Sequence, residues 1–352
     1  MDGIKSDLNV HMDGYANNID AVRRVLALAE ANGVKAISLL EQDAIRLYRE
    51  GGVLQRLIKS GEMKKLYTGK LIAGCEFTCV VNATDPTKYA FNFNGHQIHV
   101  TMLNFDIKYI EGIKWFDPKF KEKCIKKDVK SFCKLLKQYG LEVPKKNYFR
   151  YDRGLGYQLY DYMHSTPERL ARYERILGQY PNAYTFVKSL FDDPTSKLYF
   201  RQSQIPQLTD ILECVRRARG RIYISHPSYM NKKFNTVSYL DALLNVKTEY
   251  GFPFDGIEVY YGQNSPIETK VLNDYALSHN LEKSGNGDFK YLYSDRNPEG
   301  KAVFIYDNEK MTYVPKPGFL IRNFMDTRQG DIILDRRFID RFDDIRETPR
   351  FE

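Results

Sequence analysis

The stretch IDAVRRVLALAEANGVKAISLL, residues 19–40, predicts a helix that leads directly into a buried strand. Its first half repeats apolar residues at helical spacing (Val22, Val25, Leu26 and Ala29), and the following Asn32-Gly33 pair is typical of a helix C-terminus. The mostly apolar stretch over residues 34–40 is typical of a buried strand. Helices that alternate with strands indicate an α/β fold with a mostly parallel sheet.

The alternation continues on both sides of this stretch. Short apolar runs predict further strands over residues 7–10, 71–74, 97–103, 221–225 and 255–260. Apolar residues at helical spacing predict helices over residues 211–219, 237–250 and 267–278. We therefore expect an α/β domain over residues 1–106 and 208–299, a helical insertion over 107–207, and a C-terminal extension over 300–352.

The positive charge of the chain is concentrated in the insertion. Residues 107–150 contain 13 basic and five acidic residues, an excess that equals the net charge of +8 of all 352 residues. A predicted helix there carries an apolar stripe (Ile125, Val129, Phe132 and Leu136) surrounded by lysines that include Lys126, Lys127, Lys130 and Lys134.

A lysine-rich helix most often presents only a solvated face. The same region also contains several aromatic residues (Trp115, Phe116, Phe120, Tyr139, Tyr148 and Phe149). Lysines that contact phosphates, together with rings that stack on bases, are typical of proteins that bind single-stranded nucleic acid. We therefore expect the four lysines above to contact a nucleotide or nucleic acid. A membrane-surface role would need a larger exposed apolar face.

Other features argue against export and membrane insertion. No run of about 18 apolar residues occurs, so no spanning helix is expected. Residues 1–15 lack the apolar core of a signal peptide. The five cysteines include no Cys-x-x-Cys pair, which disfavours a zinc knuckle or a redox motif. We expect a cytoplasmic protein with reduced thiols.

Histidines and carboxylates fall at or near the ends of several predicted strands. They are His11, Glu76, His99, His226 and Asp288. The carboxyl ends of parallel strands meet at one edge of a sheet, so these side chains are expected to converge. A single histidine at such a place is usually structural. Together, however, the set has the ligand types that hold zinc, manganese or iron.

Five segments in this order resemble motifs of the polymerase and histidinol phosphatase (PHP) family. Residues 6–11 resemble its opening Asp-Leu-His-x-His, and residues 36–43 resemble its apolar strand followed by Thr-Asp-His. Residues 74–78 resemble Gly-x-Glu-(Ile/Phe)-Thr, and residues 225–227 resemble Ala-His-Pro. Residues 256–290 align without a gap on the closing segment that ends in Gly-Ser-Asp-Phe-His.

The insertion is similar to that of one branch of this family. Residues 184–190, 206–208 and 214–220 resemble the branch that contains nucleotide and nucleoside-bisphosphate phosphatases and 5′-3′ exoribonucleases. The resemblance covers residues 5–295. It implies a distorted (β/α)7 barrel of the PHP type with a helical insertion, and up to three metal ions at the C-terminal ends of the strands.

The family's metal ligands are retained unevenly. The resemblance implies one intact site made of Glu76, His99 and His226. A second site keeps His11, Glu76 and Asp288, with Asn9 in place of a histidine; an amide oxygen suits manganese better than zinc. The alternative of Asp295 in place of Asp288 would need a gap in the alignment. The third site is lost, because Gln42 and Lys290 occupy its two histidine positions.

The resemblance thus implies a phosphoesterase with one or two divalent metal ions (manganese, zinc or iron). His11, Glu76, His226 and Asp288 would be its catalytic residues, and Lys290, Gln42 and Arg216 would contact substrate phosphate. The expected substrate is a nucleotide or the end of a nucleic acid. The alternative is a catalytically inactive PHP-like module that binds nucleotide or nucleic acid. A protein partner or an oligomer interface is assigned to the extension over residues 300–352.

Overall fold

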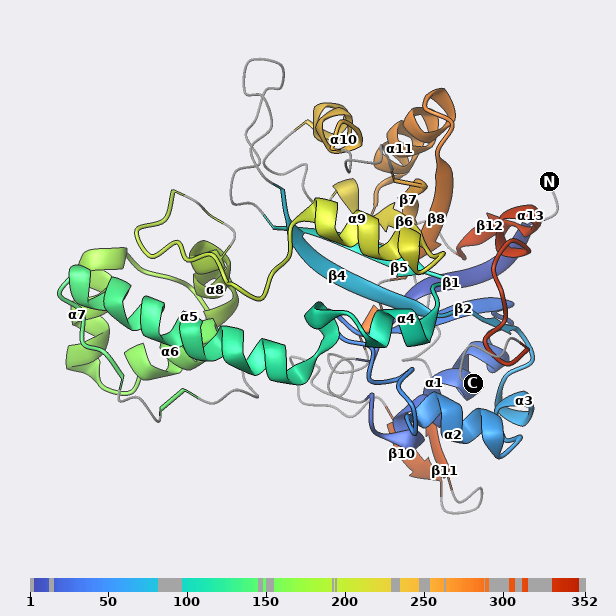
Figure 1. Ribbon diagram of the computed structural model, residues 1–352, viewed down its shortest axis with the longest axis horizontal. Coiled ribbons are helices and arrows are strands. Elements are labelled where there is room, and N and C mark those ends of the chain that lie inside the picture. The colour runs from blue at the N-terminus through green and yellow to red at the C-terminus, as the bar shows by residue number, and fades with distance from the viewer. Residues whose placement is uncertain are drawn as a thin grey trace. The chain divides into compact units, whose positions relative to one another are not determined.

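The computed structural model divides into two compact units. The first contains residues 1–78, 99–113 and 209–352, and the second contains residues 79–98 and 114–208. The structure describes residues 3–12, 16–81, 97–144, 148–149, 155–191, 193, 195–228, 235–246, 254–262, 264–287, 289–290, 304–307, 312–315 and 331–347. Figure 1 labels their helices and strands.

One sheet of the first unit is built around β1 (Gly3–His11), as Figure 1 shows. It has the order β12-β1-β2-β3, with β2 at Ala36–Leu40 and β3 at Lys70–Leu71. These strands are parallel, except for the antiparallel edge strand β12 (Ile333–Asp335). The short strand β9 (Phe289–Lys290) pairs in parallel with the carboxyl end of β1.

A second sheet has the order β4-β5-β6-β7-β8. Its strands are β4 (Gly74–Val80), β5 (Gln97–Leu103), β6 (Arg221–Ile224), β7 (Gly256–Tyr261) and β8 (Glu282–Asn286). The last three are parallel, whereas β5 runs antiparallel to β6. The prediction of an α/β fold is confirmed, but β5 runs against the neighbouring β6 in this sheet.

The two sheets meet at two places. Residue Gln42, just after β2, forms a parallel bridge with Glu76 of β4. On the other side, the backbone N–H of Gly287, after β8, donates to Asp7 Oδ1 of β1 at 3.2 Å. The described strands nevertheless form separate hydrogen-bonded sheets, so the closed barrel stays a prediction.

The predicted strand over residues 71–74 is wrong in its boundaries. The chain changes sheets there: the N–H of Ile72 still donates to Ile37 O of β2 at 2.9 Å, whereas Ala73 O accepts the N–H of Asn104 at 2.7 Å. Two strands, β3 and β4, therefore replace the single predicted strand. As a result Glu76 lies within β4 and does not follow a strand.

The helices of the first unit begin where the sequence supplies capping groups. Helix α1 (Ile19–Ala31) begins after Asn18, whose side chain accepts the N–H groups of Asp20 and Ala21. It ends before Gly33, which has a φ of +68°. The other helices of this unit are α2 (Val53–Lys59), α3 (Met63–Leu66), α4 (Ile107–Glu111), α9 (Leu208–Arg217), α10 (Thr236–Leu244), α11 (Pro266–Ser278) and α13 (Arg336–Ile339).

The segment over residues 331–347 belongs to the first unit. Its strand β12 adds to β1, and Figure 1 shows these two strands side by side. Arg346 donates to Tyr67 O at 2.8 Å and to Gly69 O at 2.6 Å, and it is paired with Asp344. Lys70 Nζ donates to two carbonyl oxygens of the segment. These bonds tie it to the loop that precedes β3.

The second unit is helical in its described part. It contains the 21-residue helix α5 (Pro118–Gln138), the 3-10 turn η1 (Lys114–Phe116), α6 (Leu155–Met163), α7 (Pro167–Leu177) and α8 (Ala183–Phe191). It has its own core, which includes Val129, Phe132 and Leu136 of the predicted stripe. Phe116 and Phe149 are buried, so neither ring is available to stack on a base. No helix in the described ranges is long and apolar enough to span a membrane.

Candidate metal centre

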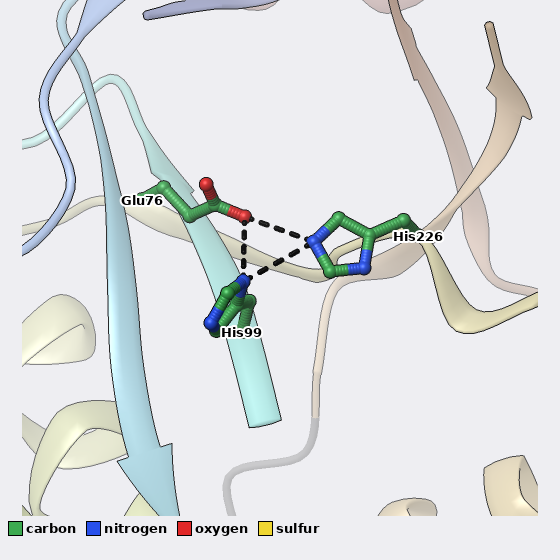
Figure 2. A group of neighbouring side chains, drawn as sticks. All are labelled: Glu76, His99 and His226. Carbon is green, nitrogen blue, oxygen red and sulfur yellow. Dashed lines mark hydrogen bonds and ion pairs between the residues drawn. The ribbon is translucent and has the colours of Figure 1, made fainter. Parts of the chain in front are cut away.

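Three side chains from different strands of one sheet converge on a point in the first unit (Figure 2). Glu76 comes from β4, His99 from β5, and His226 follows β6. Glu76 Oε1 lies 3.2 Å from His226 Nε2 and 3.4 Å from His99 Nδ1, and the two nitrogens lie 3.3 Å apart. All three ligand atoms fall within 4.8 Å of one another, so the group can hold a metal ion.

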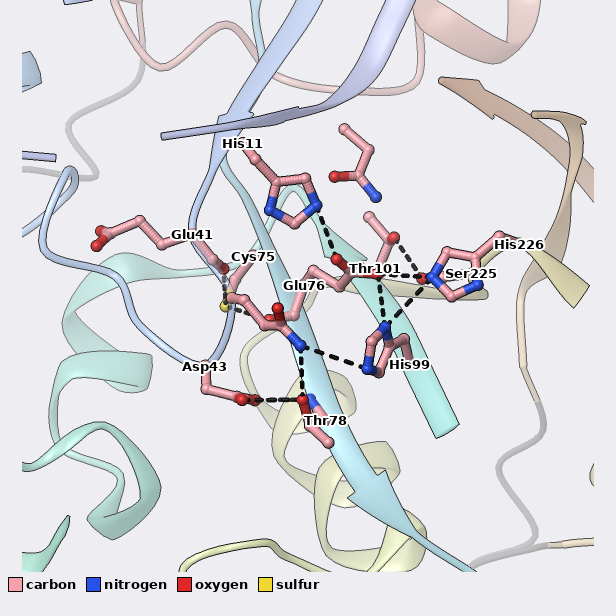
Figure 3. Close-up of polar contacts among 12 residues, drawn as sticks. His11, Glu41, Asp43, Cys75, Glu76, Thr78, His99, Thr101, Ser225 and His226 are labelled. Carbon is pink, nitrogen blue, oxygen red and sulfur yellow. Dashed lines mark hydrogen bonds and ion pairs between the residues drawn. The ribbon is translucent and has the colours of Figure 1, made fainter. Parts of the chain in front are cut away.

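His11, the last residue of β1, approaches the other oxygen of the same carboxylate (Figure 3). Its Nε2 lies 2.8 Å from Glu76 Oε2, and both side chains are almost fully buried. Glu76 therefore faces two histidines with one oxygen and a third histidine with the other. A carboxylate placed in this way can bridge two ions.

The environment of Glu76 keeps its carboxyl ionised. Burial alone would raise the pKa, but the His11 and His99 rings and the hydrogen bonds from His11 and His226 hold the pKa well below its usual range. The site thus contains a buried negative charge surrounded by imidazoles. A divalent cation compensates that charge and takes up the imidazole lone pairs.

The protein backbone holds His226 in an unusual conformation. Its φ angle is +31°, which is uncommon for a residue with a side chain. The His226 N–H donates to Glu258 Oε2 of β7 at 2.6 Å. The preceding residue, Ser225, shares a hydrogen bond of 2.8 Å with Thr101 of β5. These contacts fix the direction in which the imidazole leaves the backbone.

A chain of hydrogen bonds supports His99 from the side opposite Glu76 (Figure 3). Gln42 Nε2 lies 3.3 Å from His99 Nε2 and donates to Thr78 Oγ1 at 3.1 Å. Thr78 in turn donates its hydroxyl to Asp43 Oδ2 at 2.9 Å and its N–H to Asp43 Oδ1 at 2.6 Å. Asp43 has a φ of +57°. The network fixes the His99 ring from the nitrogen that does not face Glu76.

The structure brings together five of the residues named from the sequence. Glu76, His99, His226 and His11 meet as described, and Gln42 contacts His99. The Gln42 amide nitrogen is thus engaged by protein groups, and nothing in its contacts assigns it to substrate phosphate. Asn9 is buried two residues before His11 in β1.

Other predicted site residues lie elsewhere. Arg216, in the last turn of α9, lies 4.0 Å from Asp255, which precedes β7. The structure therefore places it at the amino end of the strands, away from the metal centre. The four lysines of α5 are exposed on the second unit. Asp288 and the alternative Asp295 lie outside the described residues, as does the side chain of Lys290; the Lys290 backbone pairs with His11.

Sequence reasoning missed the residues that support the ligands. Thr78, Asp43, Thr101 and Glu258 do not bind the candidate ion but hold its ligands. A signal was present for Glu258, because it is a charged residue inside an otherwise apolar strand and is buried there. Asp43 and Thr78 fall within two of the segments that resemble family motifs, but the sequence does not indicate their contact, because they lie 35 residues apart in the chain. Thr101 carries no such signal, and its partner Ser225 is 124 residues away.

The spacing of the ligand atoms fits a bound cation. Metal–ligand bonds of about 2.0–2.2 Å place neighbouring ligand atoms about 3.0–3.6 Å apart. The distances among Glu76, His99 and His226 lie in that range. Two imidazoles and a carboxylate leave coordination positions for water or substrate, as in catalytic sites.

No family model and no curated protein matches this sequence. Among solved structures, the chain is similar to a protein from Bifidobacterium adolescentis described as a candidate metal-dependent phosphoesterase, with 16% identity and a TM-score of 0.45 over 80% of this chain and 86% of that one. It is also similar to an amidohydrolase from Chromobacterium violaceum, solved with sulfate and without metal, with 17% identity and a TM-score of 0.46 over 81% of this chain and 87% of that one. At this level of similarity, the assignment of a function rests on the side-chain geometry of the site.

Proposed function

We propose that the protein is a metal-dependent hydrolase that cleaves a phosphate ester. The observation that carries the proposal is the buried Glu76 carboxylate, which faces His99 and His226 with one oxygen and His11 with the other. Glu76, His99 and His226 would hold a first divalent ion, and Asn9, His11, Glu76 and Asp288 would hold a second. A bound ion lowers the pKa of a coordinated water and neutralises charge on a phosphoryl group.

The residues of the chain have distinct roles in this proposal. Glu76 holds negative charge between the two ion positions, because its pKa is depressed. Glu258 holds the backbone of His226 in place, and Gln42 contacts the His99 nitrogen that does not face Glu76. Lys290, whose backbone pairs with His11, would contact a phosphate oxygen. None of the histidines is needed as a proton donor.

A nucleotide or single-stranded nucleic acid is the substrate class that we propose. Lys127, Lys130 and Lys134 are exposed along α5, and the exposed Lys126 is paired with Glu122. Tyr139 and Tyr148 are each 37% exposed and can stack on bases. The support for this class is the charge and the exposed tyrosines of the helical unit.

The experiment combines metal analysis with a phosphate-release assay. Purified protein is analysed for bound manganese, zinc and iron, and phosphate release is measured from nucleotides and from 5′-phosphorylated RNA. His226→Ala should lose bound metal and at least about 100-fold of the activity. His164→Ala, which removes an exposed histidine of the second unit, is the matched control. If the purified wild-type protein contains no metal and releases no phosphate when manganese is added, the proposal is wrong.

The second candidate function is a nucleotide-binding module without turnover. Asn9 favours it, because an amide replaces an imidazole next to His11. The two functions differ in one result. A module without turnover would bind its metal ions and nucleotide but release no phosphate.

A further inference from the structure

Two buried asparagine side chains near the metal centre have polar atoms without partners. Asn9 is 1% exposed and Asn286 is 0% exposed. Among the residues that the structure describes, both amide oxygens and both amide nitrogens lack a hydrogen-bond partner. A buried polar group left in this state costs about 1–3 kcal/mol. Four such atoms in one region indicate that a missing ligand completes them.

The two asparagines lie close to each other. Asp7 Oδ1 accepts the N–H of Asn9 at 3.3 Å and the N–H of Gly287, the residue after Asn286, at 3.2 Å. This one carboxylate oxygen therefore connects the backbone of β1 at Asn9 with the backbone just after Asn286 at the end of β8. From there the chain continues into β9, which pairs with Val10 and His11.

Asn286 also points toward the metal centre. A side chain at the preceding Gly285 would meet Ile332 and Tyr260, so that position faces the outer layer. By the alternation of a strand, Asn286 faces the opposite side. It is paired in register with Tyr261, whose ring centroid lies 5.6 Å from that of His226. Asn286 thus lies between the His226 side of the site and β1.

The burial of the amides limits what can bind them. Each of the four amide atoms has less than 1 Å² of accessible surface, so a substrate group cannot reach them. A metal ion can, because it approaches an oxygen ligand to about 2.0–2.2 Å. The buried Glu76 carboxylate, 2.8 Å from His11 Nε2, is a further oxygen ligand for such an ion.

We propose that Asn286 is a ligand of the second divalent ion, and that its amide oxygen acts together with that of Asn9. The inference rests on the proposed function, because the ion is the second of its two. Coordination by two amide oxygens and the Glu76 carboxylate, with His11 as the nitrogen ligand, makes an oxygen-rich site. Such a site selects manganese or magnesium over zinc.

The experiment measures metal stoichiometry and affinity by titration calorimetry, together with the electron paramagnetic resonance spectrum of bound manganese. Asn286→Ala should lose one of two bound manganese ions or weaken its binding at least about tenfold. Asn286→Asp keeps an oxygen ligand and adds charge, so it should retain both ions and lower the melting temperature of the metal-free protein.

Asn264→Ala is the matched control. Asn264 is equally buried, but its amide accepts the hydroxyl of Ser228 and donates to Val259 O at 3.1 Å. Its replacement should lower the melting temperature in chelator more than Asn286→Ala does, and leave the metal stoichiometry at two.

The outcomes separate this inference from the proposed function. If wild-type protein binds two ions and Asn286→Ala binds both with unchanged affinity, the inference is wrong while the function stands. If the wild type binds a single ion, the inference is also wrong and the proposed function stands. If the wild type binds none, both are wrong. Should Asn286→Ala fail to fold, Asn286→Ser decides in the same way.

Discussion

Glu258 Oε2 accepts the backbone N–H of His226 at 2.6 Å and thereby holds a residue whose φ angle is +31°. A buried carboxylate of β7 thus holds the backbone of a candidate metal ligand that follows β6. Contacts of this kind determine whether an imidazole is ready to coordinate before the ion arrives.

Glu258→Gln should therefore weaken metal binding about 10–100-fold, since the neutral amide holds the strained backbone less firmly. Calorimetric titration with manganese measures the change. Asp128→Asn is the matched control: Asp128 is a buried carboxylate of the second unit that accepts the N–H of Ser203 at 2.9 Å. Equal losses of affinity in the two variants would show that general destabilisation, and no orienting role, explains the effect.

Glu76→Gln should reveal the depressed pKa of this carboxyl in metal-free protein. The pKa is lower in the folded protein than in the unfolded chain, where it is about 4.3. The ionised carboxylate therefore stabilises the fold above about pH 4.3, and this stabilisation is lost as the pH falls below that value.

The free energies of unfolding of wild type and Glu76→Gln are compared by urea titration in chelator from pH 3 to pH 6. The wild-type advantage should shrink toward the acid end. Glu168→Gln, at an exposed position, should show no such trend. An advantage that grows on acidification would contradict the assignment.

Thr78→Val should lower metal affinity although Thr78 is not a ligand. The hydroxyl accepts from Gln42 and donates to Asp43, so its loss releases the amide that supports His99. A decrease of about tenfold in manganese affinity is expected. Thr236→Val is the control, because the buried Thr236 hydroxyl has no hydrogen-bond partner and lies on α10. If Thr78→Val binds manganese as wild type does, the network has no orienting role.

Replacement of the α5 lysines should flatten the salt dependence of nucleic-acid binding. Each lysine that contacts a phosphate of a single strand contributes about 0.7 to the slope of log K against log salt concentration. The variant with Lys126, Lys127, Lys130 and Lys134 changed to Gln should lose up to about 3 units of slope. Fluorescence anisotropy with single-stranded RNA from low to moderate salt measures it.

The control for this experiment changes exposed lysines of the first unit, Lys59, Lys64 and Lys65, to Gln. It should keep the wild-type slope. Binding by the wild type that does not depend on salt would reject the nucleic-acid proposal and leave the metal centre unaffected.

Arg346→Ala should destabilise the protein by about 3 kcal/mol, because it leaves the buried Asp344 without its cation and two carbonyl groups without a donor. Urea unfolding measures the loss. Arg337→Ala is the comparison: Arg337 is paired with Asp335 at the surface, with a side chain 83% exposed, and its loss should leave the unfolding midpoint nearly unchanged. A similar loss in both would mean that the contacts of Arg346 with the loop before β3 contribute nothing.

The sequence alone predicted those parts of the molecule that depend on local pattern. The helix after Asn18 and the strand that follows it are found as expected, because capping, apolar spacing and Gly33 act within a few residues. Predicting that Glu76, His99 and His226 converge depended on the order of several motifs, and the structure places these three side chains around one point.

The rest depends on contacts between distant residues. The break between β3 and β4 arises because Ala73 O pairs with Asn104, and a run of four apolar residues does not reveal that change of partner. Arg216 lies 4.0 Å from Asp255 at the amino end of β7, and the local sequence around Arg216 does not indicate this contact. The proposed ligand role of Asn286 could not be predicted from the sequence, because it rests on a buried amide that has no hydrogen-bond partner among the described residues.

The pairing of β12 with β1 has a consequence for the synthesis of the protein. Gly3, Ile4 and Lys5 are synthesised more than 300 residues before their partners Asp335, Leu334 and Ile333. Until then one edge of the strand that carries His11 stays open, and open edges promote aggregation. This edge therefore cannot close before β12 has been synthesised, and contacts of such long sequence separation slow folding.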